Sequence, residues 1–126
     1  MGLERLLLID KSALERATPE TLELGEICVC AVVRLEMLYS ARSHRDYSAI
    51  EDSLAVFRDL IMNAETIQTA VTAHRELGQK GHHRIPIPDL LIAACAQQHQ
   101  AGVLHLDRHY DVLAEVLAFE PVRLPI

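Results

Sequence analysis

Four acidic residues stand out because each one adjoins or lies within an apolar segment typical of a buried strand or helix. They are Asp10, Glu36, Asp89 and Asp107. Carboxylates that lie close together repel one another and take up protons unless a cation neutralises them. Carboxylate oxygens are also the ligands that Mg²⁺ and Mn²⁺ prefer. If the fold gathers these four side chains, the sequence predicts a divalent-metal site and a metal-dependent enzyme.

Three of these acids also have an ordinary structural explanation. Asp10 and Asp107 each follow a predicted strand and precede a predicted helix, where an aspartate commonly caps the helix. Asp89 is expected in the first turn of its helix, where a negative charge complements the helix dipole. Taken singly, each of the three is explained by structure more readily than by catalysis.

Glu36 lies well inside a predicted helix, where neither capping nor the helix dipole accounts for it. Its neighbours Val33, Leu35 and Met37 are apolar, and a buried charge requires a partner or a metal ion. Arg34 is two residues away and on a different face of the helix, so it is not a natural partner. The alternative is that Glu36 lies on a narrow exposed stripe of this helix.

Length and composition predict one domain spanning residues 1–126. No apolar run reaches the eighteen or so residues that cross a bilayer, and the first residues lack the pattern of a secretory signal. We therefore expect a cytoplasmic protein that does not enter the membrane. Three cysteines, an odd number, are expected to be small buried core residues. They are Cys28, Cys30 and Cys95.

The charge balance argues against simple electrostatic capture of nucleic acid. The chain carries 18 Asp and Glu against 12 Lys and Arg, a formal net charge of −6, whereas such proteins normally show a basic footprint. The balance does not exclude nucleic acid, because carboxylates that bind a metal ion are neutralised in use. Four cations are candidates for phosphate contact, and a solvated surface role explains each of them equally well: Arg42, Lys80, Arg84 and Arg108.

Strands and helices alternate along the sequence, which indicates an α/β fold with a mainly parallel sheet. Strands are predicted at residues 6–9, 26–30 and 103–106, with a further edge strand at 122–124. Helices are predicted to begin at residues 12 and 18 and to span 31–43, 46–62, 88–100 and 108–117. Residues 66–71 fit either a strand or the start of a helix ending at residue 78, and 78–84 form a loop. Ligands bind beyond the carboxyl ends of parallel strands, where Asp10 and Asp107 are both expected.

Four segments together resemble the PIN-domain family, and within it the VapC-type toxin ribonucleases of prokaryotic toxin–antitoxin systems. The segments are residues 8–14 (LIDKSAL), 33–42 (VRLEMLYSAR), 87–96 (IPDLLIAACA) and 103–111 (VLHLDRHYD). The order of the acids and the residues around them both match, and the resemblance spans nearly the whole chain.

The resemblance implies a PIN-like three-layer α/β/α sandwich and an endoribonuclease that hydrolyses RNA with Mg²⁺ or Mn²⁺. The metal-binding quartet of the family corresponds to Asp10, Glu36, Asp89 and Asp107, and its small hydroxyl residue corresponds to Ser12. The resemblance also implies a homodimer and a VapB-type antitoxin that covers the acidic pocket. We expect an Arg or Lys of that antitoxin to point towards the acids, because a cation can replace the charge of the metal.

Two positions depart from the pattern of many relatives. Lys11 stands where Thr or Asn is common, and His109 stands where a second Asp is common. His109 replaces an auxiliary carboxylate with an imidazole ring, so metal affinity and pH dependence could differ from those of relatives. With the four acids intact, we expect both residues to be peripheral to the site.

Two other classes of function compete with the enzyme. A non-catalytic PIN-like module for protein binding would use the acids only as helix caps. A phosphoacceptor switch would need an aspartate at a central strand end and a matching lysine at a late one. No lysine follows Lys80, so the switch is the weaker alternative.

Overall fold

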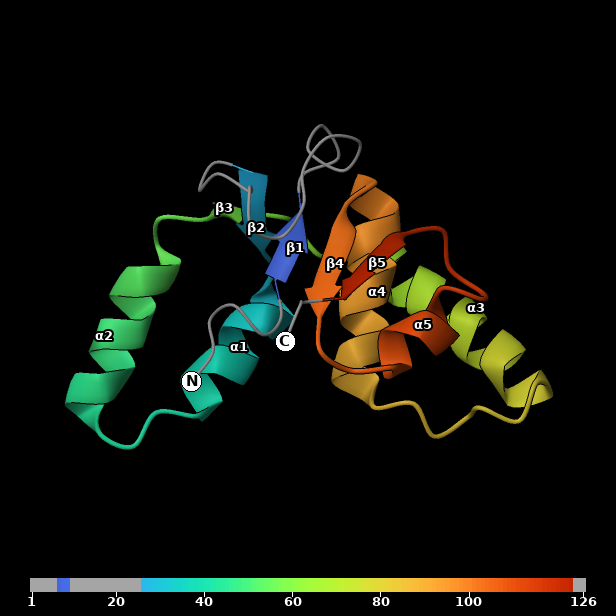
Figure 1. Cartoon of the computed structure of the whole chain (residues 1–126), viewed down its shortest axis with the longest axis horizontal. Helices are drawn as coiled ribbons and strands as arrows, with labels where there is room; N and C mark the ends of the chain where they lie inside the picture. The colour runs from blue at the N-terminus through green and yellow to red at the C-terminus, as the bar shows by residue number, and fades with distance from the viewer. Residues whose placement is uncertain (1–6, 10–25, 124–126) are drawn as a thin grey trace.

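Five short strands form a single sheet in the order β3-β2-β1-β4-β5. The computed structural model describes residues 7–9 and 26–123, and Figure 1 shows how their elements are arranged. The strands are β1 (Leu7–Ile9), β2 (Ile27–Val29), β3 (Arg58–Asp59), β4 (Gly102–His105) and β5 (Glu120–Arg123). β5 lies at one edge, as predicted for the last strand.

Four of the five strands run in the same direction. β3 is parallel to β2 and β5 is parallel to β4, whereas β1 is antiparallel to both β2 and β4. The predicted α/β fold with a mainly parallel sheet is confirmed, but the direction predicted for β1 is wrong. Ile9, at the carboxyl end of β1, pairs with Ile27 and Gly102, the first residues of β2 and β4. β1 and β4 are neighbours, but their carboxyl ends therefore point in opposite directions along the strands.

The described helices are α1 (Ala31–Tyr39), α2 (His44–Leu54), α3 (Ala64–Gln79), α4 (Ile87–His99) and α5 (His109–Leu113). α4 is the central one: it packs against α3, α5 and β4, and it lies behind β4 in Figure 1. Six of its residues are buried, which fits a helix that is apolar on most sides. They are Leu90, Ile92, Ala93, Ala94, Cys95 and Ala96.

One predicted helix boundary is wrong, and one alternative left open by the sequence is decided by the structure. The apolar periodicity of residues 46–62 predicts one helix, but α2 ends at Leu54 and β3 follows. Ile61, which a helix continued to residue 62 would place on the same face as buried Ile50 and Leu54, is 66% exposed. Residues 66–71, which fit either a strand or a helix, lie within α3, which also includes Gly78. Asn63 begins α3 as a capping box with Thr66, a local signal that favours helix over strand.

The three cysteines are buried thiols, as predicted. The hydrogen bond with Cys30 raises the pKa of the Cys95 thiol, and burial raises it further. Within residues 7–9 and 26–123, no helix has the length and apolar character needed to cross a membrane.

Candidate metal centre

Asp89 reaches the site from the first turn of α4. Pro86 precedes this helix and Pro88 lies in its first turn, where proline costs no hydrogen bond because the first amides of a helix lack intrahelical acceptors. The helix N-terminus also favours a negative charge. The two prolines therefore set the start of α4, and with it the position of the Asp89 carboxylate.

Asp107 reaches the same place from the segment between β4 and α5. Its Oδ1 accepts a hydrogen bond of 2.9 Å from the backbone N–H of His109, at the start of α5. One oxygen thus takes the structural role that the sequence predicts, which leaves Oδ2 available for a ligand. The side chain of Asp107 is half exposed, whereas that of Asp89 is mostly buried.

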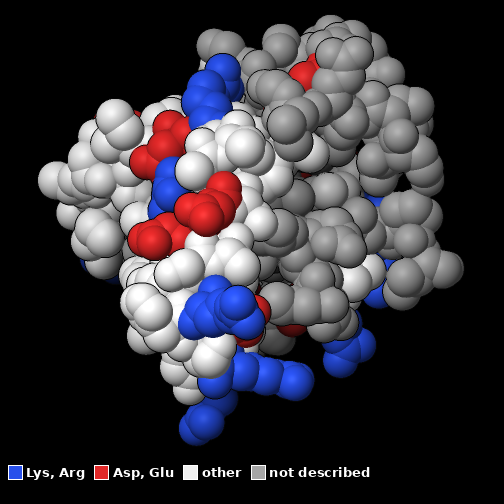
Figure 2. Space-filling view, turned by 90° about the vertical axis from the view of Figure 1, so that its left-hand side faces the viewer, with Lys and Arg blue, Asp and Glu red and all other residues white. Residues whose placement is uncertain are grey.

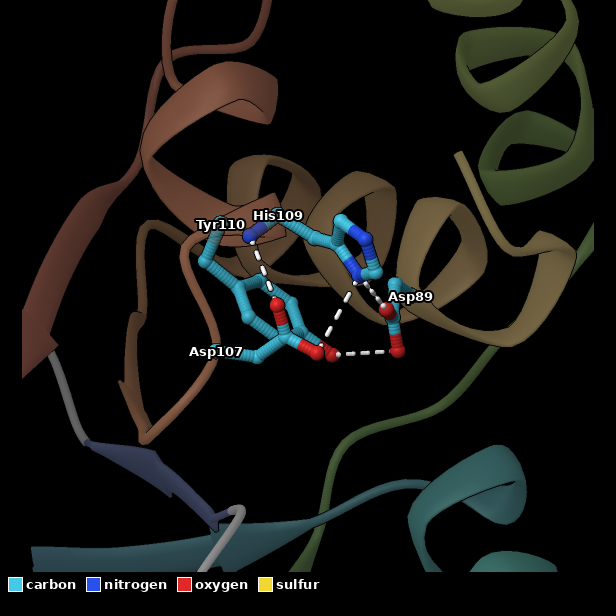
Figure 3. Close-up of polar contacts among 4 residues, drawn as sticks. All are labelled: Asp89, Asp107, His109 and Tyr110. Atoms are coloured by element: carbon cyan, nitrogen blue, oxygen red, sulfur yellow. Dashed lines mark hydrogen bonds and ion pairs between the residues drawn. The ribbon is translucent and has the colours of Figure 1, made fainter. Parts of the chain in front are cut away.

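His109 lies between the two carboxylates and is not peripheral as predicted. Its Nδ1 is 3.1 Å from Asp89 Oδ2 and 3.1 Å from Asp107 Oδ2. The three side chains come from α4, the β4–α5 segment and α5, and they converge in Figure 3. The sequence shows that His109 departs from the family pattern. It does not predict the contact of His109 with Asp89, because that contact depends on the packing of α5 against α4.

Tyr110 fixes the second oxygen of Asp89, a role that the sequence analysis missed. Its hydroxyl donates a hydrogen bond of 3.1 Å to Asp89 Oδ1. Tyr110 is buried, and its ring lies 5.2 Å from that of buried His105. Burial and the adjacent Asp89 raise the pKa of the Tyr110 phenol, so the hydroxyl keeps its proton and acts as a donor. Tyr110 and Leu113, three residues apart, form the buried face of α5, which is the one sequence signal for this placement.

Asp89 has a raised pKa, chiefly because burial disfavours its charged form. The hydrogen bonds from Tyr110 and His109 lower the pKa in part, and the charge of Asp107 raises it further. A carboxylate in this position is stabilised by a cation, since a nearby positive charge favours the ionised form.

This group of donors fits a divalent cation. One ligand atom from each of Asp89, Asp107 and His109 lies within 4.8 Å of the others. Both carboxylates have one oxygen held by a protein donor and the other turned towards the shared space. A cation bound there would offset the burial cost of Asp89 and the repulsion between the acids.

Comparison with known proteins identifies the family of this chain. The family model for the PIN domain matches residues 6–116. The chain belongs to the PIN-domain family. It is 38% identical over 120 residues to ribonuclease VapC17 of Mycobacterium tuberculosis, covering 86% of this chain and 87% of the relative. It is also 41% identical over 98 residues to ribonuclease VapC18 of the same organism, covering 75% and 72%.

Two solved structures share the fold of this PIN domain. One is VapBC-5 of M. tuberculosis, with a TM-score of 0.64 and 21% identity over 77% of this chain and 81% of that one. The other is DNA-bound VapBC of Salmonella typhimurium, with a TM-score of 0.65 and 18% identity over 76% and 74%. These likenesses confirm the predicted PIN-like α/β/α fold.

Glu36 is placed differently from the other acids of this PIN domain. It is exposed on α1, so the argument that a buried charge must be paired does not apply to it. It lines a shallow groove of about 380 Å³ between α1 and the start of α4. Pro88, next to Asp89, lines the same groove. Glu36 is therefore near the amino end of α4 but is not part of the cluster of Asp89, Asp107 and His109.

Asp10, Lys11 and Ser12 lie outside the described residues. The role of Asp10 stays a prediction that substitution can test.

The candidate RNA contacts of this PIN domain are all exposed: Arg42, Lys80, Arg84 and Arg108. Lys80 is 4.0 Å from Glu115, and the backbone N–H of Arg42 donates to Asp46. Figure 2 shows acidic side chains beside basic ones on the described part of the face that carries α2, with several basic side chains along its lower edge. The phosphate contacts of these four cations stay a prediction.

The raised pKa of Asp89 leads to a test of stability against pH. The folded state holds the Asp89 proton more tightly than the unfolded state does. The contribution of this group to stability therefore falls as pH rises from about 4, the pKa of an unfolded aspartate. In EDTA, we expect Asp89→Asn to be more stable than wild type near neutral pH, by about 0.5–2 kcal/mol. The difference should shrink towards pH 4, as measured by thermal unfolding.

The matched control for this test is Asp52→Asn, at an exposed position on α2. Its stability should differ little from wild type at every pH. A difference between Asp89→Asn and wild type that stays constant with pH would contradict the burial cost assigned to Asp89.

Proposed function

We propose that this PIN domain is an endoribonuclease that hydrolyses RNA phosphodiester bonds with Mg²⁺ or Mn²⁺, and that it acts as the toxin of a toxin–antitoxin pair in the cytoplasm. The observation that carries the proposal is the convergence of Asp89, Asp107 and His109 in a chain similar to VapC ribonucleases. Carboxylate oxygens are suited to these hard ions, which keep several waters and bind phosphate.

In this proposal, Asp89 and Asp107 hold the ion. Asp10 and Glu36 complete its shell, directly or through water, and Ser12 supports a ligand or a water. A bound divalent cation supplies Lewis acidity to the phosphate and lowers the pKa of water at the site. Tyr110 and the backbone of His109 keep the two carboxylates in place through their Oδ1 atoms. This preorganisation lowers the cost of gathering the acids around the reacting phosphate.

The partners of this PIN domain are proposed on similarity. The two structural neighbours are named as VapBC proteins, and we propose a VapB-type antitoxin as the partner of this chain. The groove lined by Glu36 and Pro88 offers that antitoxin an apolar surface beside Asp89. The family resemblance also supports a homodimer, which would extend the surface that contacts RNA.

The proposal is tested by incubating purified protein with structured RNAs and Mg²⁺ or Mn²⁺. We expect cleavage that stops in EDTA and falls by about 10²-fold or more in both Asp10→Asn and Glu36→Gln. Gel analysis of end-labelled RNA measures the rates. Mapping cleaved ends across total RNA after controlled expression would then identify the substrate.

Each contrary result has a distinct meaning. Cleavage unaffected by Asp10→Asn and Glu36→Gln would remove these two residues from the site. Cleavage that persists in EDTA would exclude the metal mechanism. Absence of cleavage on every RNA tried would favour the alternative function, a non-catalytic module that binds protein through the PIN fold.

A further inference from the structure

The position of His109 carries an inference about the identity of the metal ion. One oxygen of each carboxylate is held by a protein donor: Asp89 Oδ1 by the Tyr110 hydroxyl and Asp107 Oδ1 by the backbone N–H of His109. The remaining oxygen of each lies 3.1 Å from the same atom, His109 Nδ1. Figure 3 shows this nitrogen between the two carboxylates. The site therefore presents two oxygens and one nitrogen to a common point.

A hydrogen bond from His109 Nδ1 accounts for only one of its two contacts with carboxylate oxygens. Nδ1 carries at most one hydrogen, so it can donate one well-directed bond, yet two carboxylate oxygens lie at the same distance from it. Two metal–ligand bonds of about 2.1 Å at right angles place their ligand atoms about 3.0 Å apart. The observed spacing fits neighbouring positions around an octahedral ion.

We propose that His109 Nδ1 is a ligand of the divalent ion and that this nitrogen makes the site prefer Mn²⁺ over Mg²⁺. The inference rests on the proposed function for the presence of an ion and adds which ion is selected. Mg²⁺ is hard and takes oxygen ligands, whereas affinity for nitrogen-containing sites rises along the divalent transition series that starts with Mn²⁺. An aspartate at this position would give an all-oxygen set and remove the preference.

The test uses the full chain, freed of metal with EDTA, dialysed and then loaded with Mn²⁺. Electron spin echo envelope modulation detects nitrogen bound to Mn²⁺ without any need for activity. We expect ¹⁴N coupling in wild type and in the control His82→Asn, at an exposed loop position. The coupling should change to that of ¹⁵N when histidine is ¹⁵N-labelled, and it should be absent in His109→Asp.

Calorimetric titration with Mn²⁺ and Mg²⁺ measures selectivity directly. We expect the ratio of the two affinities to fall by about tenfold or more in His109→Asp and to stay unchanged in His82→Asn. Thermal unfolding verifies that each variant is folded. If His109→Asp does not fold, His109→Asn serves in its place, with loss of the ¹⁴N coupling as the expected result.

The outcomes separate this inference from the proposed function. RNA cleavage without nitrogen coupling in wild type, or with an unchanged affinity ratio in His109→Asp, would overturn the ligand role of His109 and leave the nuclease in place. His109 would then be a counter-ion of the two acids. Nitrogen coupling that depends on His109, without cleavage of any RNA, would support the ligand role and count against the nuclease.

Discussion

RNA cleavage by the Asp89→Asn variant is expected to fall by about 10²- to 10³-fold or more. Asp89 is the most enclosed carboxylate of the cluster, and its Oδ2 faces the space shared with Asp107 and His109. An amide carries no charge, so it would weaken the hold on a divalent ion and the stabilisation of charge on the phosphate. The Tyr110 hydroxyl can still donate to an amide oxygen, so the local packing is expected to persist.

The comparison with Asp52→Asn separates this effect from a general loss of charge. Asp52 is exposed on α2, outside the cluster, so its variant should cleave RNA at the wild-type rate. Rates are measured with excess Mn²⁺, and unfolding curves establish that both variants are folded. A folded Asp89→Asn variant with undiminished cleavage would show that the reaction takes place elsewhere.

Local chemistry in the sequence predicted the parts of the site that depend on neighbouring residues. Pro86 and Pro88 fix where α4 begins, and this boundary places Asp89 in the first turn. The buried strand before Asp107 and the helix after it define the turn in which its Oδ1 accepts a backbone hydrogen bond. In both cases the deciding interactions lie within a few residues along the chain.

The features that the sequence did not predict depend on long-range packing. His109 meets Asp89 only because α5 packs against α4, and Tyr110 reaches the same carboxylate from 21 residues away. The direction of β1 is set by its pairing with β2 and β4, and an apolar run of a few residues fits either direction. The apolar spacing that continues past α2 gave no sign of β3, because that strand contributes only Arg58 and Asp59.

The Ile92→Ala variant is expected to lose about 2–5 kcal/mol of unfolding free energy. Ile92 is fully buried on α4, so truncation to alanine removes buried methyl and methylene groups and leaves a cavity in the core. A domain of this size is typically stable by about 5–15 kcal/mol, which makes this loss a large share of the total. Urea unfolding of metal-free protein measures the effect at equilibrium.

The matched control is Ile67→Ala, on the half-exposed face of α3. Alanine favours the helix and removes little buried surface there, so we expect a change within about 0.5 kcal/mol. α4 also carries Asp89, but Ile92 itself is not part of the cluster of Asp89, Asp107 and His109. Destabilising α4 should therefore reduce cleavage only by lowering the folded fraction. Cleavage per folded molecule, measured at low temperature, should therefore match wild type. A loss per folded molecule comparable to that of Asp89→Asn would mean that Ile92 packing sets the position of the carboxylate, not only the stability of the core.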